Sequence, residues 1–303
     1  MTTIITKEGT ILITYQVPEN TSLCSVRAFL KGKGVSGGLF RRIKNSGSFW
    51  LNGIPIHANG TILRPGDRIS YEYPEPPQDI EPEDIPLDIR YEDNDLLIIN
   101  KPAGMLVHPT PQTTSGTLAN ALIYYYRKKG EKTLFHSVHR LDRMTSGLLL
   151  AAKRPEIQHL LSTKEGKLFH REYIAIAEGI IEPPEGIISL PIARNPESII
   201  TRIVSPEGKP AITNYKTEQI FKKESAVFSL LRLSLVTGRT HQIRVHLSHM
   251  GHPLLGDDLY GGTLEFIPRQ ALHAERILLD HPITGEKIDI HAELPKDMAD
   301  MIV

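Results

Sequence analysis

The chain has 303 residues, 40% hydrophobic and 23% charged, which excludes a disordered protein and leaves room for one large domain and a smaller one. Its single cysteine, Cys24, excludes an intrachain disulfide, and no run of about 18 apolar residues is present to form a membrane-spanning helix. The first ten residues lack the features of a signal peptide, so we expect a cytoplasmic protein with no membrane attachment.

The formal net charge is zero, but the charges are unevenly distributed along the chain. No Asp or Glu occurs from Asn20 to Pro65, whereas segment 74–86 contains five acidic residues and no basic one. A local basic patch attracts phosphates whatever the total charge is, so the first stretch is a candidate nucleic-acid surface; an ordinary solvated surface is the alternative. The basic residues of this stretch are Arg27, Lys31, Lys33, Arg41, Arg42, Lys44 and Arg64.

The N-terminal part predicts a small α+β domain over residues 1–74. Thr21 or Ser22 can cap a helix that runs to about Gly32, and Gly37-Gly38 breaks the chain before a short basic helix. Asn52-Gly53 lies between two apolar runs and predicts a tight hairpin, because both positions tolerate positive φ. The sequence Arg-Pro-Gly-Asp at 64–67 predicts a turn into a last strand at 68–73.

An acidic, proline-rich linker follows at 75–86, where the prolines disfavour both helices and sheet ladders. The remainder, 87–303, alternates apolar strands with amphipathic helices in a mixed order, which predicts an α+β domain with helices packed on a sheet. We expect strands at 96–99, 147–152, 172–177 and 227–236, and helices at 117–129, 155–161 and 240–250.

The segment His139-Arg140-Leu141-Asp142-Arg143-Met144-Thr145-Ser146-Gly147 places a carboxylate between two arginines, just before an apolar strand. Neighbouring cations lower the pKa of a carboxyl group and keep it ionised. Asp142 is therefore a candidate nucleophile, but a surface salt-bridge cluster explains the charge pattern equally well.

A second segment, Gly238-Arg239-Thr240-His241-Gln242-Ile243-Arg244-Val245-His246, combines a strand end with a helix start that Thr240 can cap. Arg244 lies one turn into this helix, where it could pair with Asp142 or contact phosphate. The nearby histidines do not predict a metal site, because their spacing fits no closed zinc motif and the helix offers no carboxylate or thiolate ligand.

Tyr173, at the start of a predicted strand, is either a core residue or a ring that stacks on a flipped base. Two further loops are rich in glycine and proline, and scaffolding and direct contact explain them equally well. These loops are Asn100–Pro109 and Gly251–Asp257.

Taken together and in order, five motifs resemble the RluA type of pseudouridine synthase, which modifies large-subunit ribosomal RNA and tRNA. They are HRLDRMTSG, GRTHQIRVH, KPAGMLVHP, GHPLLGD and RQALHA. Residues 20–73 resemble the S4 RNA-binding domain through Phe49-Trp50-Leu51-Asn52-Gly53 and Leu63-Arg64-Pro65-Gly66-Asp67-Arg68-Ile69. The resemblance implies a mixed or mainly antiparallel sheet in the large domain.

The resemblance also implies site residues and a reaction. Asp142 would be the nucleophile, Tyr173 would stack on the base, and Arg244 would orient the carboxylate. Arg140 would fill the space of the flipped uridine, and Lys101 and Lys209 would hold phosphates. The sequence leaves open whether Asp142 attacks C1′, attacks C6 or removes a ribose proton.

Reactant and product are isomers, so no cofactor and no metal ion is expected. We expect a monomer whose partner is RNA, with ribosomal RNA favoured over tRNA. A non-catalytic RNA-binding factor and a base-releasing hydrolase are the alternative functions. The hydrolase is disfavoured because such enzymes typically present paired carboxylates.

Overall fold

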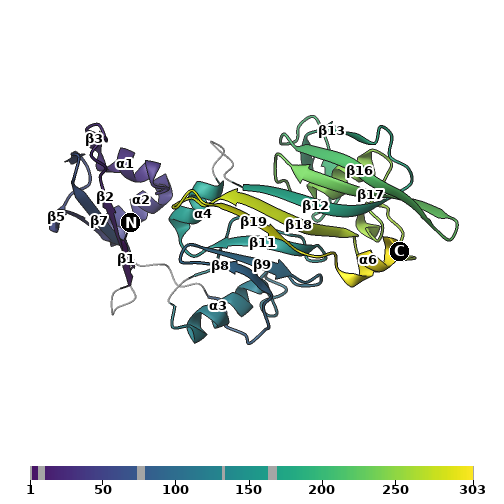
Figure 1. The fold of residues 1–303 in the computed structure, drawn as a ribbon, viewed down its shortest axis with the longest axis horizontal. Helices are drawn as coiled ribbons and strands as arrows, with labels where there is room; N and C mark the ends of the chain where they lie inside the picture. Colours follow the sequence, from purple (N-terminus) through teal and green to yellow (C-terminus); the bar gives the residue numbers. More distant parts are fainter. Residues whose placement is uncertain (1, 6–10, 74–78, 132–133, 163–168, 303) are drawn as a thin grey trace.

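The computed structural model describes residues 2–5, 11–73, 79–131, 134–162 and 169–302, which form two bodies side by side (Figure 1). In the smaller body, a five-stranded sheet in the order β1-β2-β7-β4-β5 and two helices enclose a single apolar core. Its elements are β1 (Thr2–Ile5), β2 (Ile11–Gln16), β3 (Cys24–Ser25), α1 (Val26–Gly32), α2 (Gly37–Ser46), β4 (Ser48–Leu51), β5 (Ile54–Ile56), β6 (Ile62–Leu63) and β7 (Arg68–Tyr73).

The basic helix α2 starts earlier than predicted. The Ser36 hydroxyl accepts a hydrogen bond from the Leu39 amide (3.1 Å), which satisfies one of the amides that a helix start leaves without a partner. Gly37 and Gly38 therefore lie in the first turn of α2, and the prediction that they break the chain is wrong. The serine cap and the burial of Leu39, Phe40 and Ile43 offset the poor helix propensity of glycine.

Helix α1 ends at Gly32 as predicted, but it begins only at Val26. The residues just before it, Cys24 and Ser25, pair with β6 as a short strand, and Ser25 rather than Thr21 or Ser22 caps the helix.

The predicted hairpin between β4 and β5 is confirmed. Asn52 and Gly53 both have positive φ (52° and 83°), as a two-residue hairpin turn requires. The Asn52 side chain donates to the carboxylate of Asp67 and accepts from the amide of Arg68, both at 2.8 Å. This pair of bonds ties the hairpin turn to the predicted turn that opens β7.

The larger body is built on a ten-stranded sheet in the order β13-β16-β17-β12-β18-β11-β9-β8, with β10 beside β11 and β19 beside β18. Its described pairs are antiparallel except for β11 and β18, which run parallel, so the predicted α+β class with a mixed, mainly antiparallel sheet is confirmed. Its strands are β8 (Ile89–Glu92), β9 (Leu96–Lys101), β10 (His136–Ser137), β11 (Ser146–Ala152), β12 (Phe169–Glu178), β13 (Glu185–Ser189), β16 (Ile212–Lys223), β17 (Ala226–Leu235), β18 (Leu272–Asp280) and β19 (Lys287–His291). A separate hairpin consists of β14 (Ile192–Arg194) and β15 (Arg202–Val204), and the helices are α3 (Leu118–Lys128), α4 (Pro155–Ser162), α5 (Gln242–His249), the short 3-10 helix η1 (Asp258–Tyr260) and α6 (Lys296–Ile302).

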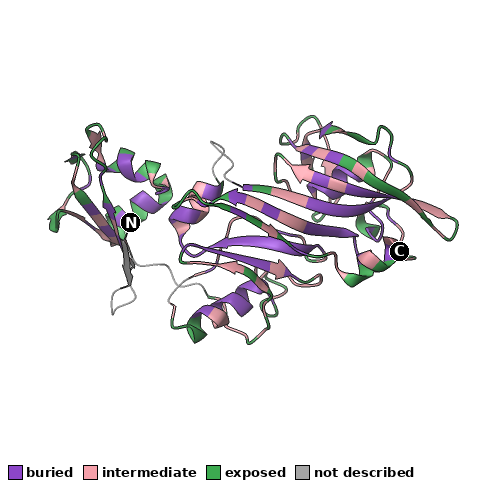
Figure 2. Cartoon of the chain, viewed as in Figure 1, coloured by how far each residue is buried: buried purple, intermediate pink, exposed green. Residues whose placement is uncertain are grey.

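Strands β9 and β11 are buried along almost their whole length (Figure 2). Alternate residues of β9 face opposite sides of the sheet. Leu97 and Ile99 join the core that contains α3, whereas Leu96 and Ile98 join the core that contains α4. A strand covered on both faces needs an unbroken apolar sequence, which is why these strands are the easiest to predict.

The described part of the predicted linker, residues 79–86, forms neither helix nor strand and lies against α3. The Asn120 side chain donates to the carbonyl of Glu81 (2.7 Å), and the Glu83 amide donates to the carbonyl of Asn120 (3.1 Å). Ile80 packs against the core beneath α3. Residues 75–78, the rest of the predicted linker, lie outside the described residues.

The two bodies meet at α4. The Tyr71 hydroxyl of β7 donates to the carboxylate of Glu156 (2.6 Å), and neither residue has exposed surface. A Cβ at Gly34 would lie 2.6 Å from the Glu156 carbonyl oxygen, so the backbones also approach closely. Burial, reinforced by the charge of Glu156, raises the pKa of Tyr15 to about 12. In the described part of the chain, no helix has the length and apolar character needed to cross a bilayer.

Candidate active site

Asp142 lies in the loop that joins β10 to β11. The side chain of Leu141 is buried in the main core and anchors this loop, and the Thr145 amide donates to the Asp142 carbonyl (3.1 Å) to close a turn. The Asp142 side chain is 26% exposed. Its carboxylate is therefore held by the protein and still open to a substrate.

Directly after this loop, β11 passes very close to β18. Gly147 has a φ of +108°, and a Cβ at this position would lie 2.3 Å from the carbonyl oxygen of Ala274. Only glycine accepts both the backbone angle and the contact. Gly147, the last residue of the motif HRLDRMTSG, thus fixes the path by which the Asp142 loop enters β11.

Arg244 connects Asp142 to a second aspartate. Its Nη1 donates to Oδ2 of Asp142 at 3.0 Å, while its Nε and Nη2 donate to the two carboxylate oxygens of Asp257, each at 2.7 Å. Burial opposes the charge of Arg244, but the hydrogen bonds and charge of Asp257, together with Asp142, raise its pKa above the ordinary value. A permanent cation is therefore fixed against the candidate nucleophile.

His241 and Tyr260 form the wall beside this ion pair. His241 has a left-handed φ of 57° and precedes α5 without a side-chain cap, so the predicted cap by Thr240 is wrong. Its Nδ1 lies 2.7 Å from the Tyr260 hydroxyl, and its Nε2 lies 3.9 Å from Oδ2 of Asp142. The guanidinium of Arg244 lies over the Tyr260 ring, 4.9 Å from its centre. The backbone turn at His241 thus aims an imidazole, rather than a hydroxyl cap, at Asp142.

Burial, which Asp142 opposes and Arg244 reinforces, lowers the pKa of His241 below its usual value. The imidazole is therefore mainly neutral at neutral pH, and the charge that faces Asp142 comes from Arg244.

Tyr173 lies on β12 and is 4% exposed. Between Glu172 and Tyr173 the pairing with β18 shifts by one residue, and such bulges commonly re-aim a side chain next to an active site. Burial, with the charge of Asp142 adding to it and Arg171 opposing it, raises the pKa of Tyr173. The structure therefore brings Tyr173 within electrostatic reach of Asp142 and keeps its hydroxyl protonated.

Lys101 has a different environment from the predicted one. It is completely buried, and its ammonium donates to the carbonyls of Pro102 (2.8 Å), Met105 (2.9 Å) and Arg143 (3.2 Å). An ammonium has three N–H donors, and all three are used here. In this arrangement Lys101 holds the loop that follows Asp142 and has no donor left for a phosphate, so the expected phosphate contact stays a prediction.

The other basic residues of the prediction are exposed. Arg140 lies two residues before Asp142, and Lys209 pairs through its backbone with Ile192 at the start of β14. Among the described residues, the arginine that pairs with Asp142 is Arg244. Arg140 and Arg143, which flank Asp142 in the sequence, do not pair with it there. The RNA-binding residues predicted in the smaller body are also exposed; they are Arg27 of α1 and Arg41, Arg42 and Lys44 of α2.

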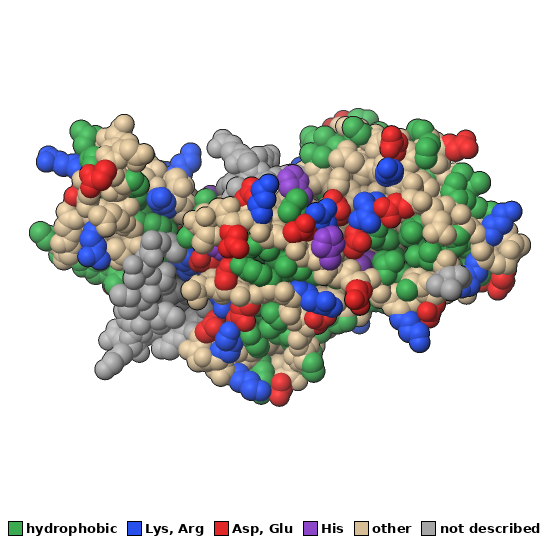
Figure 3. Space-filling view, in the orientation of Figure 1, with side chains coloured by type: hydrophobic (Ala, Val, Ile, Leu, Met, Phe, Trp, Pro, Cys, Tyr) green, Lys and Arg blue, Asp and Glu red, His purple; other side chains and the backbone are tan. Residues whose placement is uncertain are grey.

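Acidic and basic side chains are intermixed across the face of the larger body seen in Figure 3. Cross-strand ion pairs account for many of the charges on this sheet; Arg276, for example, lies 2.7 Å from Asp289 of β19 and 3.4 Å from Glu172 of β12. Cations that already have carboxylate partners offer little to a phosphate backbone. This sheet surface is therefore a poor candidate for binding RNA.

Asp257 and Tyr260 complete the site, although the sequence does not assign either of them a role. Asp257 ends the apolar, glycine-containing loop GHPLLGD, and a carboxylate in such a run is a signal for a buried cationic partner. In the structure this loop holds Arg244 through the buried carboxylate of Asp257, which is a scaffolding role. For Tyr260, no pattern in the sequence signals its position.

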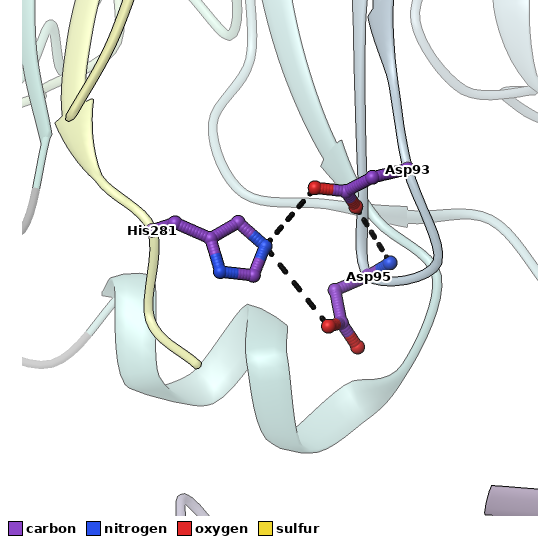
Figure 4. Close-up of side chains that lie close together, drawn as sticks. All are labelled: Asp93, Asp95 and His281. Carbon is purple, nitrogen blue, oxygen red and sulfur yellow. Dashed lines mark hydrogen bonds and ion pairs between the residues drawn. The ribbon is translucent and has the colours of Figure 1, made fainter. Parts of the chain in front are cut away.

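Asp93, Asp95 and His281 lie close enough together to be considered as metal ligands (Figure 4). Nδ1 of His281 accepts hydrogen bonds from the amides of Ile283 (3.2 Å) and Thr284 (3.0 Å), so Nε2 carries the ring proton. This nitrogen lies 3.1 Å from Oδ2 of Asp93, and a protonated nitrogen has no lone pair for a metal ion. The cluster is best explained as a structural contact that holds the loop after β18 to the turn before β9.

Known proteins give an independent comparison. Residues 95–249 match the family model described as RNA pseudouridylate synthase. The chain is 45% identical over 237 residues to ribosomal large subunit pseudouridine synthase D of Haemophilus ducreyi, covering 73% of this chain and 71% of the relative. It is 39% identical over 282 residues to the uncharacterized RNA pseudouridine synthase YjbO of Bacillus subtilis, covering 92% and 98%.

Among solved structures, human RNA pseudouridylate synthase domain containing 1 is similar, with a TM-score of 0.57, 27% sequence identity and coverage of 72% of this chain and 86% of that one. The sequence similarity and the fold thus agree with the motifs that surround Asp142. The chain belongs to the RNA pseudouridylate synthase family and is an RNA pseudouridine synthase of the RluA type.

Proposed function

We propose that the enzyme isomerises specific uridines of large-subunit ribosomal RNA and that Asp142 is its nucleophile. The observation that carries this proposal is the arrangement in which Arg244 holds Oδ2 of Asp142 while Asp257 holds Arg244. A reacting carboxylate must be ionised and oriented. A buried guanidinium, fixed by a second carboxylate, does both and leaves Oδ1 of Asp142 for the substrate.

The reaction breaks the bond between N1 and C1′ of uridine, rotates the base and joins C5 to C1′; the proton on C5 is released and N1 takes up a proton. The base must first leave its stack, because its reacting atoms are shielded in a helix. Asp142 would act covalently to retain the intermediate, and Tyr173 would stack on the flipped base. Arg140, exposed beside the site, would occupy the space that the uridine leaves.

Ribosomal RNA is the proposed substrate because relatives at 45% and 43% identity are named as ribosomal large subunit synthases. tRNA is the alternative. We also propose that residues 1–74 form an S4-like RNA-binding domain, joined by the linker 75–86 to the catalytic domain 87–303. In α2, the apolar side chains are buried while Arg41, Arg42 and Lys44 face solvent, as a phosphate-binding helix requires. We further propose that the enzyme is a cytoplasmic monomer. Sedimentation of the purified enzyme, with and without RNA, would test its oligomeric state.

The test of the nucleophile is the Asp142→Asn variant. It should form no pseudouridine in unmodified, C5-tritiated large-subunit ribosomal RNA, as measured by tritium release, while its affinity for that RNA stays normal. Asp280→Asn removes the same charge from an exposed position at the end of β18 and should keep full activity. A wild-type rate in Asp142→Asn would reject the nucleophile, and release of free uracil by the wild-type enzyme would reject isomerisation.

The test of the smaller body is neutralisation of Arg41, Arg42 and Lys44 by glutamine. RNA affinity should fall and its salt dependence should weaken, by about 0.7 to 0.9 in the log–log slope for each lost phosphate contact. The single-turnover rate at saturating RNA should stay unchanged. A collapse of that rate with normal affinity would contradict the RNA-binding role. Parallel assays with tRNA transcripts would identify the substrate class.

A further inference from the structure

The hairpin of β14 and β15 carries two adjacent isoleucines at its tip. Ile199 is 94% exposed and Ile200 is 58% exposed, and Ile199 is the most exposed large apolar residue in the described part of the chain. Single exposed apolar side chains are common on soluble proteins. Two neighbours at the tip of a projecting hairpin instead form a small apolar patch, and such patches commonly mark a contact with another molecule.

The loop that bears these isoleucines is held in one shape by its own polar groups. The Ser198 hydroxyl accepts from the amides of Ile200 (3.2 Å) and Thr201 (3.1 Å). Nη1 of Arg202 donates to the carbonyls of the same two residues, at 3.0 and 2.8 Å. The Asn195 side chain donates to the Thr201 hydroxyl (3.0 Å). The loop therefore presents its apolar tip to solvent in an ordered form, which lowers the entropic cost of binding.

Strand β15 attaches the hairpin to the wall formed by His241 and Tyr260. The Arg202 amide donates to the Tyr260 hydroxyl at 2.9 Å, and the same hydroxyl lies 2.7 Å from Nδ1 of His241. His241 in turn lies 3.9 Å from Asp142. Ile192 of β14 packs with residues of α5 and β15, so the hairpin and the catalytic helix share a small core. The hairpin thus projects from the wall of His241 and Tyr260, which lies beside Asp142.

The charges near the tip are mixed, with a small basic excess. The loop end of the hairpin carries Arg194, Arg202 and Glu197, whereas Lys209 and Glu207 lie beside its base, where Lys209 pairs with Ile192. A basic excess next to an apolar tip favours an RNA partner, whose phosphates flank its bases. Two isoleucines are also too little surface for a stable protein partner, since such interfaces bury at least about 1,000 Å². Apolar wedges, by contrast, commonly enter between bases and unstack them.

We propose that Ile199 and Ile200 form an apolar wedge that packs against unstacked RNA bases beside the target uridine. The wedge holds the RNA open while that uridine occupies the active site. This inference rests on the proposed function, because it requires an RNA substrate whose uridine reaches Asp142. It adds a surface that opens the substrate and that is separate from Asp142, Tyr173 and Arg244.

The test compares the double variant Ile199→Ser/Ile200→Ser with Ile187→Ser/Ile220→Ser, which changes two exposed isoleucines of β13 and β16. Two RNA substrates are used: a folded, unmodified large-subunit ribosomal transcript and a short unstructured fragment with the same uridine. With the wedge variant, kcat/KM on the folded transcript should fall at least about tenfold, which corresponds to only partial burial of the two side chains against the bases. On the short fragment, where no stack has to open, kcat/KM should stay close to wild type, as it should with the control variant on both RNAs.

A second readout does not depend on catalysis. In the Asp142→Asn background, 2-aminopurine placed next to the target uridine should brighten when the enzyme binds, because the probe becomes unstacked. The wedge variant should lose most of this increase. The proposal would be overturned if the wedge variant kept the wild-type kcat/KM on the folded transcript. An equal loss of kcat/KM on both RNAs would also overturn it. Absence of pseudouridine with the wild-type enzyme on every RNA would instead reject the proposed function.

Discussion

Arg244 and Asp257 form a bidentate ion pair inside the protein, with both donor–acceptor distances at 2.7 Å. The Asp257 side chain has no exposed surface, and that of Arg244 is 8% exposed. The remaining nitrogen of Arg244 reaches Asp142. The position of the proposed nucleophile therefore depends on Asp257, a buried residue that acts through Arg244.

We expect Asp257→Asn to lower the single-turnover rate about 100-fold at saturating RNA, because Arg244 loses the partner that aims it and Asp142 is no longer oriented. Breaking a buried ion pair also costs about 3–5 kcal/mol of folding free energy, so the melting temperature should fall. Asp258→Asn, which changes the exposed neighbour, should alter neither quantity. If Asp257→Asn reacts at the wild-type rate, the pair does not orient Asp142.

Gly147→Ala should destabilise the fold by about 2–4 kcal/mol, because the new methyl group would lie 2.3 Å from the Ala274 carbonyl oxygen and the backbone angle is left-handed. Gly104→Ala is the matched control: its φ is +87°, but its Cβ would have no neighbour within 4 Å. The control should cost only the backbone strain, about 1 kcal/mol. Urea denaturation of both variants measures the difference, and equal losses would rule out the close contact at Gly147.

Lys101 should make stability depend on pH. Burial, opposed by Asp142 and reinforced by Arg269, lowers its pKa from 10.5 to about 7. Between these two values the unfolded chain holds a proton that the folded protein has released, so stability rises with pH across this window. The gain is at most about 1.4 kcal/mol per pH unit.

The Lys101→Met variant removes the titrating group while keeping a side chain of similar length. Chemical denaturation of both proteins at intervals from pH 6 to pH 10 gives the two slopes. The wild-type slope should exceed that of the variant above pH 7. Parallel slopes would mean that Lys101 keeps the same pKa in the folded and unfolded states.

The sequence predicts β9 and β11 because burial on both faces leaves an unbroken apolar run, and it predicts α3 from apolar residues at helical spacing. It does not predict β18, where Glu275 and Arg276 interrupt the apolar run; these charges form ion pairs with Arg232 of β17 and Asp289 of β19. Nor does it predict β13, an edge strand that is largely exposed. Such strands depend on partners far away in the chain.

The same distinction applies to the site. The motifs bring Asp142 and Arg244 to attention, and the structure places them 3.0 Å apart, as one reading of the sequence predicts. The roles of Asp257 and Tyr260 and the burial of Lys101 follow from tertiary packing. They become visible only when the loops around Asp142 and the start of α5 are placed side by side.

The contact between the two bodies gives a last prediction. Tyr71→Phe removes the hydroxyl that donates to the buried carboxylate of Glu156. A charged acceptor that loses a buried donor costs about 1.5–3 kcal/mol, and the loss falls on the junction between the bodies. We therefore expect the smaller body to become more sensitive to proteolysis and its amide hydrogens to exchange faster, while the core strands β9 and β11 remain protected.

Tyr124→Phe is the control, because its hydroxyl donates to Asp84 at an exposed position (3.0 Å) and its removal should change little. Hydrogen exchange followed by mass spectrometry resolves the two bodies separately. If Tyr71→Phe leaves exchange in the smaller body unchanged, the Tyr71–Glu156 bond does not couple it to α4. If exchange rises equally in both bodies, the bond supports the global fold, and the junction is not an independent unit of stability.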